Sequence, residues 1–236
     1  MTLSIKGLQK TTLVDYPGKV ACTVFLPNCN FRCGFCHSKV LVENFDSMDT
    51  IPFYKIAGFL KQKKGWIDGV VITGGEPSLH NGALVELIVA IKSLGFQIKL
   101  DTNGTNPELL KEVIGRHMVD YIAMDIKAPL REKDYQNAVR CKVDIERIIR
   151  SKDIILNSDI DYEFRTTVVP GIVNKENIAL IAKAIENAKK YCLQQYVPRD
   201  TLDPAFLSLK PYPIEEIRAM ADSILPYIRN IILRPN

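Results

Sequence analysis

Long apolar runs are missing from this 236-residue sequence. No stretch of 18 consecutive apolar residues occurs, whereas a membrane-spanning helix needs about 20. The first six residues, Met1 to Lys6, do not form the apolar core of a secretory signal peptide. We therefore expect a cytoplasmic protein that does not span a membrane.

Strong net charge and long charged runs are missing too. The net charge is +4, from 31 Lys and Arg against 27 Asp and Glu. The densest basic run, residues 61–64, lies at the end of a predicted helix, where the helix dipole favours cations. Nucleic-acid binders instead gather cations on one face, so we expect no nucleic-acid partner. No hydrophilic linker or low-complexity run interrupts the chain, and the sequence predicts one domain over residues 1–236.

Common catalytic signatures are absent as well. The sequence has three histidines, and none belongs to a Ser-His-Asp arrangement. Neither a phosphate-binding loop nor a dinucleotide-binding fingerprint is found. We therefore expect no side chain of this protein to act as a catalytic acid, base or nucleophile.

Cysteine is present, but not in a disulfide framework. The chain has six cysteines, and half of them fall within eight residues, a spacing typical of metal or redox ligands. The other three are isolated and are expected to be small buried hydrophobic residues. The clustered cysteines are Cys29, Cys33 and Cys36, and the isolated ones are Cys22, Cys141 and Cys192.

The clustered cysteines have the spacing C-x3-C-x2-C. Cysteine thiolates hold iron–sulfur clusters, and a four-iron cluster normally takes four of them. Three ligands leave one iron open, as a metal site needs when it binds a reactant. Two alternatives are a zinc site that uses His37 as fourth ligand, and a cluster that only carries electrons.

Strands and helices alternate along most of the chain. Apolar, β-branched runs predict buried strands, and apolar residues at helical spacing predict the helices between them. This alternation favours parallel strands with right-handed crossovers. We expect an α/β fold, an open, partial TIM-like barrel of about six βα units around a parallel sheet. The predicted strands are 20–26, 69–73, 96–100, 121–124, 162–169 and 192–196, with helices at 51–64, 83–94, 107–116, 143–151, 175–190 and 214–225.

Unusual polar residues or glycines follow each of these strands. In parallel α/β folds, ligands bind at the carboxyl ends of strands, so this edge is the predicted site. The pair Gly74-Gly75 lets the backbone approach a ligand closely. Arg165 can bind a carboxylate through two parallel hydrogen bonds, and Lys127 supplies a point charge. Helix caps and surface ion pairs are the alternative interpretation. The remaining candidates are Gly74, Gly75, Glu76, Asp101, Thr102 and Asp125.

These motifs together resemble the radical S-adenosylmethionine (SAM) superfamily. Cys29 to His37 resembles its cluster-binding loop, and Gly74 to Pro77 its motif for the SAM amino group. The resemblance implies that Cys29, Cys33 and Cys36 bind a [4Fe-4S] cluster and that Phe35 lies beside the SAM adenine. It also implies that Gly74, Gly75 and Glu76 bind SAM, and that Asp101, Thr102 and Asp125 surround a monovalent cation beside the SAM carboxylate.

Several segments together resemble the activating proteins of anaerobic ribonucleoside-triphosphate reductase. They are residues 14–18, the cysteine loop, residues 101–104 and 124–127, and the stretch from Arg165 to Gly171. That family implies reductive cleavage of SAM to a 5′-deoxyadenosyl radical, which takes a hydrogen from a glycine of the reductase. Flavodoxin or ferredoxin is the implied reductant, and no catalytic side chain is needed. The alternatives are an activase of the pyruvate formate-lyase type and a small-molecule enzyme such as 7-carboxy-7-deazaguanine synthase.

Overall fold

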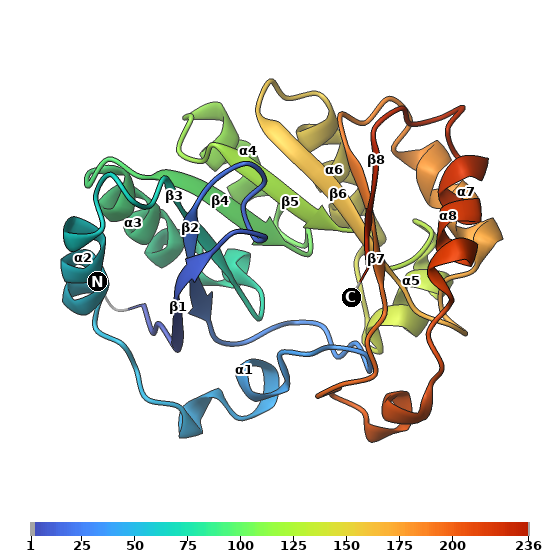
Figure 1. Ribbon diagram of the computed structural model, residues 1–236, viewed down its shortest axis with the longest axis horizontal. Coiled ribbons are helices and arrows are strands. Elements are labelled where there is room, and N and C mark those ends of the chain that lie inside the picture. The colour runs from blue at the N-terminus through green and yellow to red at the C-terminus, as the bar shows by residue number, and fades with distance from the viewer. Residues whose placement is uncertain (1–2, 236) are drawn as a thin grey trace. The chain divides into compact units, whose positions relative to one another are not determined.

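The structure is a computed structural model that describes residues 3–235 (Figure 1). Its contacts divide the chain into two compact units. The first unit contains the chain up to Asn30, Val40–Thr102 and Glu108–Ile122, and the second contains Phe31–Lys39, Asn103–Pro107 and the chain from Ala123 onward. The single domain expected over residues 1–236 stays a prediction.

The first unit is built on strands β1 to β4, drawn in blue to green in Figure 1. Strand β1 (Gly7–Thr12) is antiparallel to β2 (Ala21–Leu26), with an irregularity between Gln9 and Thr12. Strand β2 pairs in parallel with β3 (Gly69–Gly74), and β3 pairs in parallel with β4 (Gln97–Thr102). Because β2 and the first four residues of β3 are nearly all buried, their sequences are continuous apolar runs, as expected of parallel strands covered on both faces.

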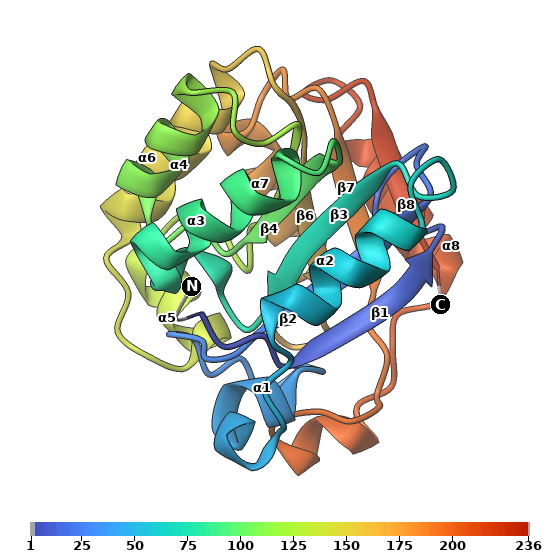
Figure 2. The ribbon, with the colours of Figure 1, turned by 90° about the vertical axis from the view of Figure 1, so that its left-hand side faces the viewer.

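Helices α2 (Phe53–Gln62) and α3 (Asn81–Lys92) lie in front of these strands in Figure 2. Helix α2 buries Ile56 and Leu60, which are four residues apart and therefore on one face. Helix α3 buries an apolar stripe of four residues. The shorter elements of this part of the chain are α1 (Lys39–Glu43), η1 (Phe45–Ser47), η2 (Pro77–His80) and α4 (Pro107–Gly115).

The second unit holds three strands that pair in parallel. Strand β6 (Asp161–Val168) pairs with β7 (Tyr191–Gln195), and β7 with β8 (Ile231–Arg234). Strand β5 (Tyr121–Asp125) crosses the boundary between the units. The helices are α5 (Glu132–Val139), α6 (Ile145–Leu156), α7 (Lys175–Ala184), α8 (Ile214–Ser223) and the short η3 (Pro204–Ser208).

The strands form an eight-stranded, mostly parallel sheet in the order β1 to β8, and this sheet does not close into a barrel. The expected α/β class and open, partial TIM-like barrel are therefore confirmed. Strand β1 and helix α5 had not been predicted from the sequence. Among the described residues, no helix has the length and apolar character needed to cross a membrane.

Candidate functional site

In the first unit, the chain leaving β2 toward Cys29 is held by backbone hydrogen bonds. The amide of Gly75 donates to the Leu26 carbonyl at 2.9 Å, and the amide of Glu76 donates to the Asn28 carbonyl at 2.7 Å. Asn28 itself has a φ of 68°, in the left-handed region that asparagine tolerates better than most residues. The turn after β3 therefore fixes the start of the cysteine loop.

Gly74 and Gly75 are required by this backbone packing. A Cβ on Gly74 would lie 2.5 Å from the Leu26 nitrogen, and a Cβ on Gly75 would lie 2.5 Å from the Asn28 carbonyl carbon. Gly74 also has a φ of +130°, which L-residues rarely adopt. The structure thus gives the glycine pair a reason that the sequence did not reveal: it lets two chain segments of the protein touch. Contact of this pair with SAM stays a prediction.

Glu76 and Thr102 are brought together. The Glu76 side chain is 1% exposed, and its Oε1 accepts hydrogen bonds from Thr102 Oγ1 at 2.8 Å and from the Ser78 amide at 3.0 Å. The Ser78 bond makes Glu76 the N-cap of η2. The carboxylate is therefore fixed in orientation by two donors from its own unit.

Asp101 has a different partner from Thr102. The two residues are adjacent on β4, where successive side chains point to opposite faces. Asp101 forms an ion pair with Lys99, which is 1% exposed. Lys99 was not predicted as a site residue, although a lysine two residues before an aspartate on a strand must share its face. The cation site formed by Asp101, Thr102 and Asp125 stays a prediction.

In the second unit, three predicted site residues form one ion-pair group. Asp125 ends β5, Lys127 follows it by two residues, and Arg165 lies on β6. Lys127 Nζ lies 2.8 Å from Asp125 Oδ2, and Arg165 Nε lies 2.7 Å from Asp125 Oδ1. Each carboxylate oxygen thus has its own cationic donor, and two cations against one anion leave the group with a net charge of +1.

The pKa shifts in this group follow its geometry. Burial alone would raise the pKa of Asp125, but Arg165 and Lys127 hold it well below its usual range. Burial alone would lower the pKa of Lys127, yet the Asp125 carboxylate raises it above its usual value, and the proximity of Cys33 and Cys36 acts in the same direction. Lys127 is therefore a permanent cation within electrostatic reach of two of the three clustered cysteines.

The second half of the cysteine loop, from Phe31 onward, belongs to this unit. Cys33 is 6% exposed and Cys36 is partly exposed, and neither forms a disulfide. The Cys36 amide donates to the Cys33 carbonyl at 3.0 Å, which forms a tight turn. Phe35 is buried, with its ring centroid 6.3 Å from that of Phe206. Its predicted place beside adenine stays a prediction, because its visible contact is a packing one.

His37, the fourth ligand of the zinc alternative, has a backbone partner. The His37 ring lies 2.9 Å from the Val197 carbonyl through Nε2, so it is engaged with backbone. Among the described residues, no group of three or more His, Cys, Asp or Glu side chains is arranged to hold a metal ion. The cluster assignment rests on the cysteine spacing and on donor chemistry, since none of the three cysteines forms a disulfide and thiolates are the ligands that iron–sulfur clusters require.

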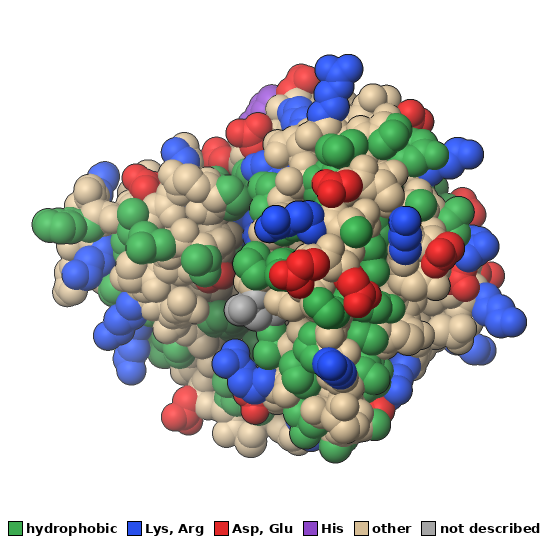
Figure 3. Space-filling model, turned by 45° about the vertical axis from the view of Figure 1, so that its right-hand side comes forward, with side chains coloured by type: hydrophobic (Ala, Val, Ile, Leu, Met, Phe, Trp, Pro, Cys, Tyr) green, Lys and Arg blue, Asp and Glu red, His purple; other side chains and the backbone are tan. Residues whose placement is uncertain are grey.

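The surface in Figure 3 mixes its charges. Lys and Arg side chains alternate with Asp and Glu side chains among hydrophobic ones. A continuous basic area, as nucleic-acid-binding proteins present, is not seen on this face.

Comparison with known proteins identifies the family. The sequence model of the Radical SAM superfamily matches residues 23–188. A protein of Methanocaldococcus jannaschii named as a glycyl-radical enzyme activating enzyme is 34% identical over 240 residues, covering 99% of this chain and 97% of its own. The chain belongs to the radical SAM superfamily and, within it, to the glycyl-radical enzyme activating enzymes.

A second relative and a solved structure extend the comparison. A 7-carboxy-7-deazaguanine synthase of Thermococcus kodakarensis is 26% identical over 212 residues, covering 81% of this chain and 79% of the relative. A crystal structure of Streptococcus suis SuiB bound to S-adenosylmethionine has a TM-score of 0.63 at 18% identity, over 89% of this chain and 48% of SuiB. This radical SAM chain spans about half the length of SuiB, and at this identity the likeness shows the fold alone. The superfamily implies a [4Fe-4S] cluster and SAM as cofactors.

Proposed function

We propose that this radical SAM enzyme activates a glycyl radical enzyme, namely anaerobic ribonucleoside-triphosphate reductase. The observation that carries the proposal is the ion-pair group of Asp125, Lys127 and Arg165. Asp125 and Lys127 lie at the carboxyl end of β5 and Arg165 lies on β6, and Cys33 and Cys36 are within electrostatic reach of Lys127. The group occurs in a chain that matches an activating enzyme over 99% of its length. When bound, the reduced cluster and SAM supply a 5′-deoxyadenosyl radical that takes a hydrogen atom from a glycine of the partner.

The residues of the second unit have separate proposed roles. Lys127 and Arg165 bind the SAM carboxylate, because charge-assisted hydrogen bonds to a carboxylate are strong and Arg offers them in pairs. Asp125 orients both cations through its two oxygens. Cys33 and Cys36, together with Cys29, bind the cluster. Phe35 contributes an apolar wall beside the adenine.

The first unit supplies the remaining proposed contacts. Gly74 and Gly75 offer backbone carbonyls to the SAM ammonium group, and Glu76 adds a carboxylate held by Thr102. Asp101, Thr102 and Asp125 bind a monovalent cation. We further propose that the protein acts in the cytoplasm, where thiols remain reduced, and that flavodoxin or ferredoxin reduces it.

The test is anaerobic. The reconstituted enzyme is reduced with dithionite and mixed with SAM and either anaerobic ribonucleotide reductase or pyruvate formate-lyase. Formation of 5′-deoxyadenosine and an electron paramagnetic resonance doublet on the reductase support the proposal. A doublet on pyruvate formate-lyase alone reassigns the partner, and no doublet on either protein overturns the activase function.

Matched cysteine variants test the ligands. Cys33→Ala should lose the cluster absorbance and 5′-deoxyadenosine formation, because only two clustered thiolates remain. Cys141→Ala removes a thiol outside the cluster motif and should retain both. Retained cleavage in Cys33→Ala would contradict the ligand assignment.

Synthesis of 7-carboxy-7-deazaguanine is the second candidate function, because a synthase of this class matches 81% of the chain. It predicts that the reduced enzyme with SAM consumes a pterin substrate with no protein partner. Pterin consumption measured by chromatography, together with no doublet on either partner, would favour this candidate.

A further inference from the structure

The part of the cysteine loop that lies in the second unit, residues 31–38, belongs to no helix or strand. Its backbone groups must therefore find hydrogen-bond partners elsewhere in the chain. The segment that follows β7 supplies two of them. The Leu202 amide donates to the Cys36 carbonyl at 2.9 Å, and the Asp203 amide donates to the Gly34 carbonyl at 3.0 Å. A segment remote in sequence thus holds the backbone of the loop between its last two cysteines.

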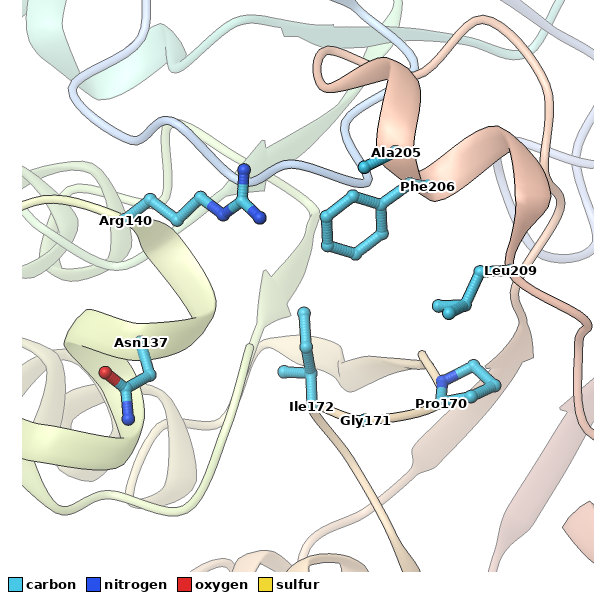
Figure 4. A pocket seen from close by; sticks show the side chains of 8 residues that line it. All are labelled: Asn137, Arg140, Pro170, Gly171, Ile172, Ala205, Phe206 and Leu209. Carbon is cyan, nitrogen blue, oxygen red and sulfur yellow. The ribbon is translucent and has the colours of Figure 1, made fainter.

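Arg140 holds the same part of the loop from a second element. It is the C-cap of α5, with a φ of 54°, and its Cζ lies 5.0 Å from the centroid of the Phe206 ring on η3. Figure 4 shows the two side chains approaching each other from these elements. Both press on the loop, since a Cβ on Gly34 would lie 3.0 Å from Arg140 Cζ and closer still to the Phe206 ring. Gly34 is therefore the point where α5, η3 and the loop meet.

Asp203 connects these contacts. Its amide binds the Gly34 carbonyl, and its Oδ2 forms an ion pair with Arg140 Nη1. Its Oδ1 accepts a hydrogen bond from the Ala205 amide at 2.9 Å, which makes Asp203 the N-cap of η3. We call Arg140, Asp203 and Phe206 the loop clamp. One cation and one anion give the loop clamp a net charge of zero.

The charge balance of the loop clamp matters because it lies near a predicted cluster ligand. Gly34 directly follows Cys33, and successive Cα atoms are about 3.8 Å apart, so the Arg140 guanidinium lies within about 9 Å of the Cys33 Cα. Reduction adds a negative charge to a cluster, and a cation at this range favours the more negative state. An unpaired Arg140 would therefore raise the reduction potential of a cluster on this loop, and the Asp203 carboxylate cancels that cation where it lies.

We propose that the loop clamp positions the cluster-binding loop without adding charge to it. Arg140 and Phe206 are positioning residues that hold the backbone at Gly34, and Asp203 prevents Arg140 from raising the reduction potential of the bound cluster. A low potential makes the reduced cluster a stronger electron donor toward SAM. This inference rests on the proposed binding of the cluster by the three clustered cysteines, and it does not depend on which partner the enzyme activates.

Two charge-removing variants test the proposal. Asp203→Asn removes the negative charge and keeps the cap of η3, because asparagine caps helices as well as aspartate does. Arg140→Gln removes the positive charge and leaves Asp203 anionic. The midpoint potential of the reconstituted cluster is measured by an anaerobic redox titration followed by electron paramagnetic resonance. At a fixed potential, Asp203→Asn should raise the ratio of reduced to oxidised cluster several-fold and Arg140→Gln should lower it, where a tenfold change corresponds to about 59 mV.

A double variant and a matched control separate charge from structure. Arg140→Gln combined with Asp203→Asn should return the midpoint potential close to the wild-type value, because the loop clamp is again neutral. Asp200→Asn makes the same change three residues earlier, at a side chain that is 80% exposed and lies 3.6 Å from Arg199. It should leave the potential unchanged. The shifts in the single variants should shrink at high salt, because Arg140 and Asp203 are both partly exposed.

The positioning role has its own measurement. Gly34→Ala places a Cβ against Arg140 and Phe206 and should displace the loop from the loop clamp. The reconstituted variant should therefore release iron to a chelator several-fold faster than the wild-type protein. Gly58→Ala adds a Cβ that meets nothing within 4 Å and should release iron at the wild-type rate.

The outcomes separate this proposal from the ligand assignment on which it rests. If the wild-type protein binds no cluster, the assignment of the three cysteines fails and the loop clamp fails with it. If the wild-type protein binds the cluster and both single charge variants keep its potential, only the charge cancellation is overturned. Shifts of both single variants in the same direction would also overturn it, since a displaced loop would then be the cause. Iron release from Gly34→Ala at the wild-type rate would overturn the positioning role.

Discussion

Replacing Gly75 with alanine should destabilise the protein, because no space exists for a side chain there. A Cβ at this position would lie 2.5 Å from the Asn28 carbonyl carbon and closer still to its oxygen. The obstacle is backbone, which cannot rotate away as a flexible side chain does. The turn after β3 must therefore separate from the segment that leads from β2 to Cys29.

The expected loss of stability is about 3–5 kcal/mol. The separation breaks the hydrogen bonds from Gly75 to Leu26 and from Glu76 to Asn28, each with a net value of about 1 kcal/mol. Forcing an extra carbon into a packed region adds about 1–3 kcal/mol. The sum is a large fraction of the roughly 5–15 kcal/mol that stabilises a typical domain.

Urea denaturation followed by circular dichroism measures this loss. Gly58→Ala is the matched control, because Gly58 lies within α2 and a Cβ there meets nothing within 4 Å. Alanine at an unobstructed helix position stabilises by about 0.5–1 kcal/mol, so the two glycine-to-alanine changes should have opposite signs. Equal midpoints for Gly75→Ala and the wild-type protein would refute the close backbone contact.

Three further predictions concern charge and thiol burial. Two cationic partners hold the pKa of Asp125 low against the effect of burial. The wild-type protein should therefore have a higher free energy of unfolding than Asp125→Asn above about pH 5, and this difference should decline as the pH falls below about 4. Urea denaturation of both proteins at several pH values measures the difference. Arg234→Met should cost about 3 kcal/mol in urea denaturation, because Arg234 binds both oxygens of the fully buried Glu163, whereas Arg234→Lys should lose less. Burial raises the pKa of Cys22 to about 12. At pH 8, iodoacetamide should therefore label Cys141 of the native protein and not Cys22, and mass spectrometry detects the label. Equal labelling of the two cysteines would contradict the burial of Cys22.

The sequence by itself predicted six of the eight strands of the described chain, β2 to β7, and supplied the candidate site residues. Runs such as residues 69–73 are apolar and β-branched, and this local composition is sufficient to predict a buried strand. The cysteine spacing and the polar residues after each strand are also local features. They predicted Asp125, Lys127 and Arg165 as site residues, and the structure brings these three together.

Only the tertiary structure decided which distant side chains meet. The sequence did not predict β1 or α5, because the burial of β1 does not alternate and α5 is short and rich in charged residues. Nor could it place Arg140 and Phe206 against Gly34, since local periodicity tells which face a residue occupies and not which remote segment covers that face. The reason that Gly74 and Gly75 must be glycine became visible only when Leu26 and Asn28 were found within contact of them.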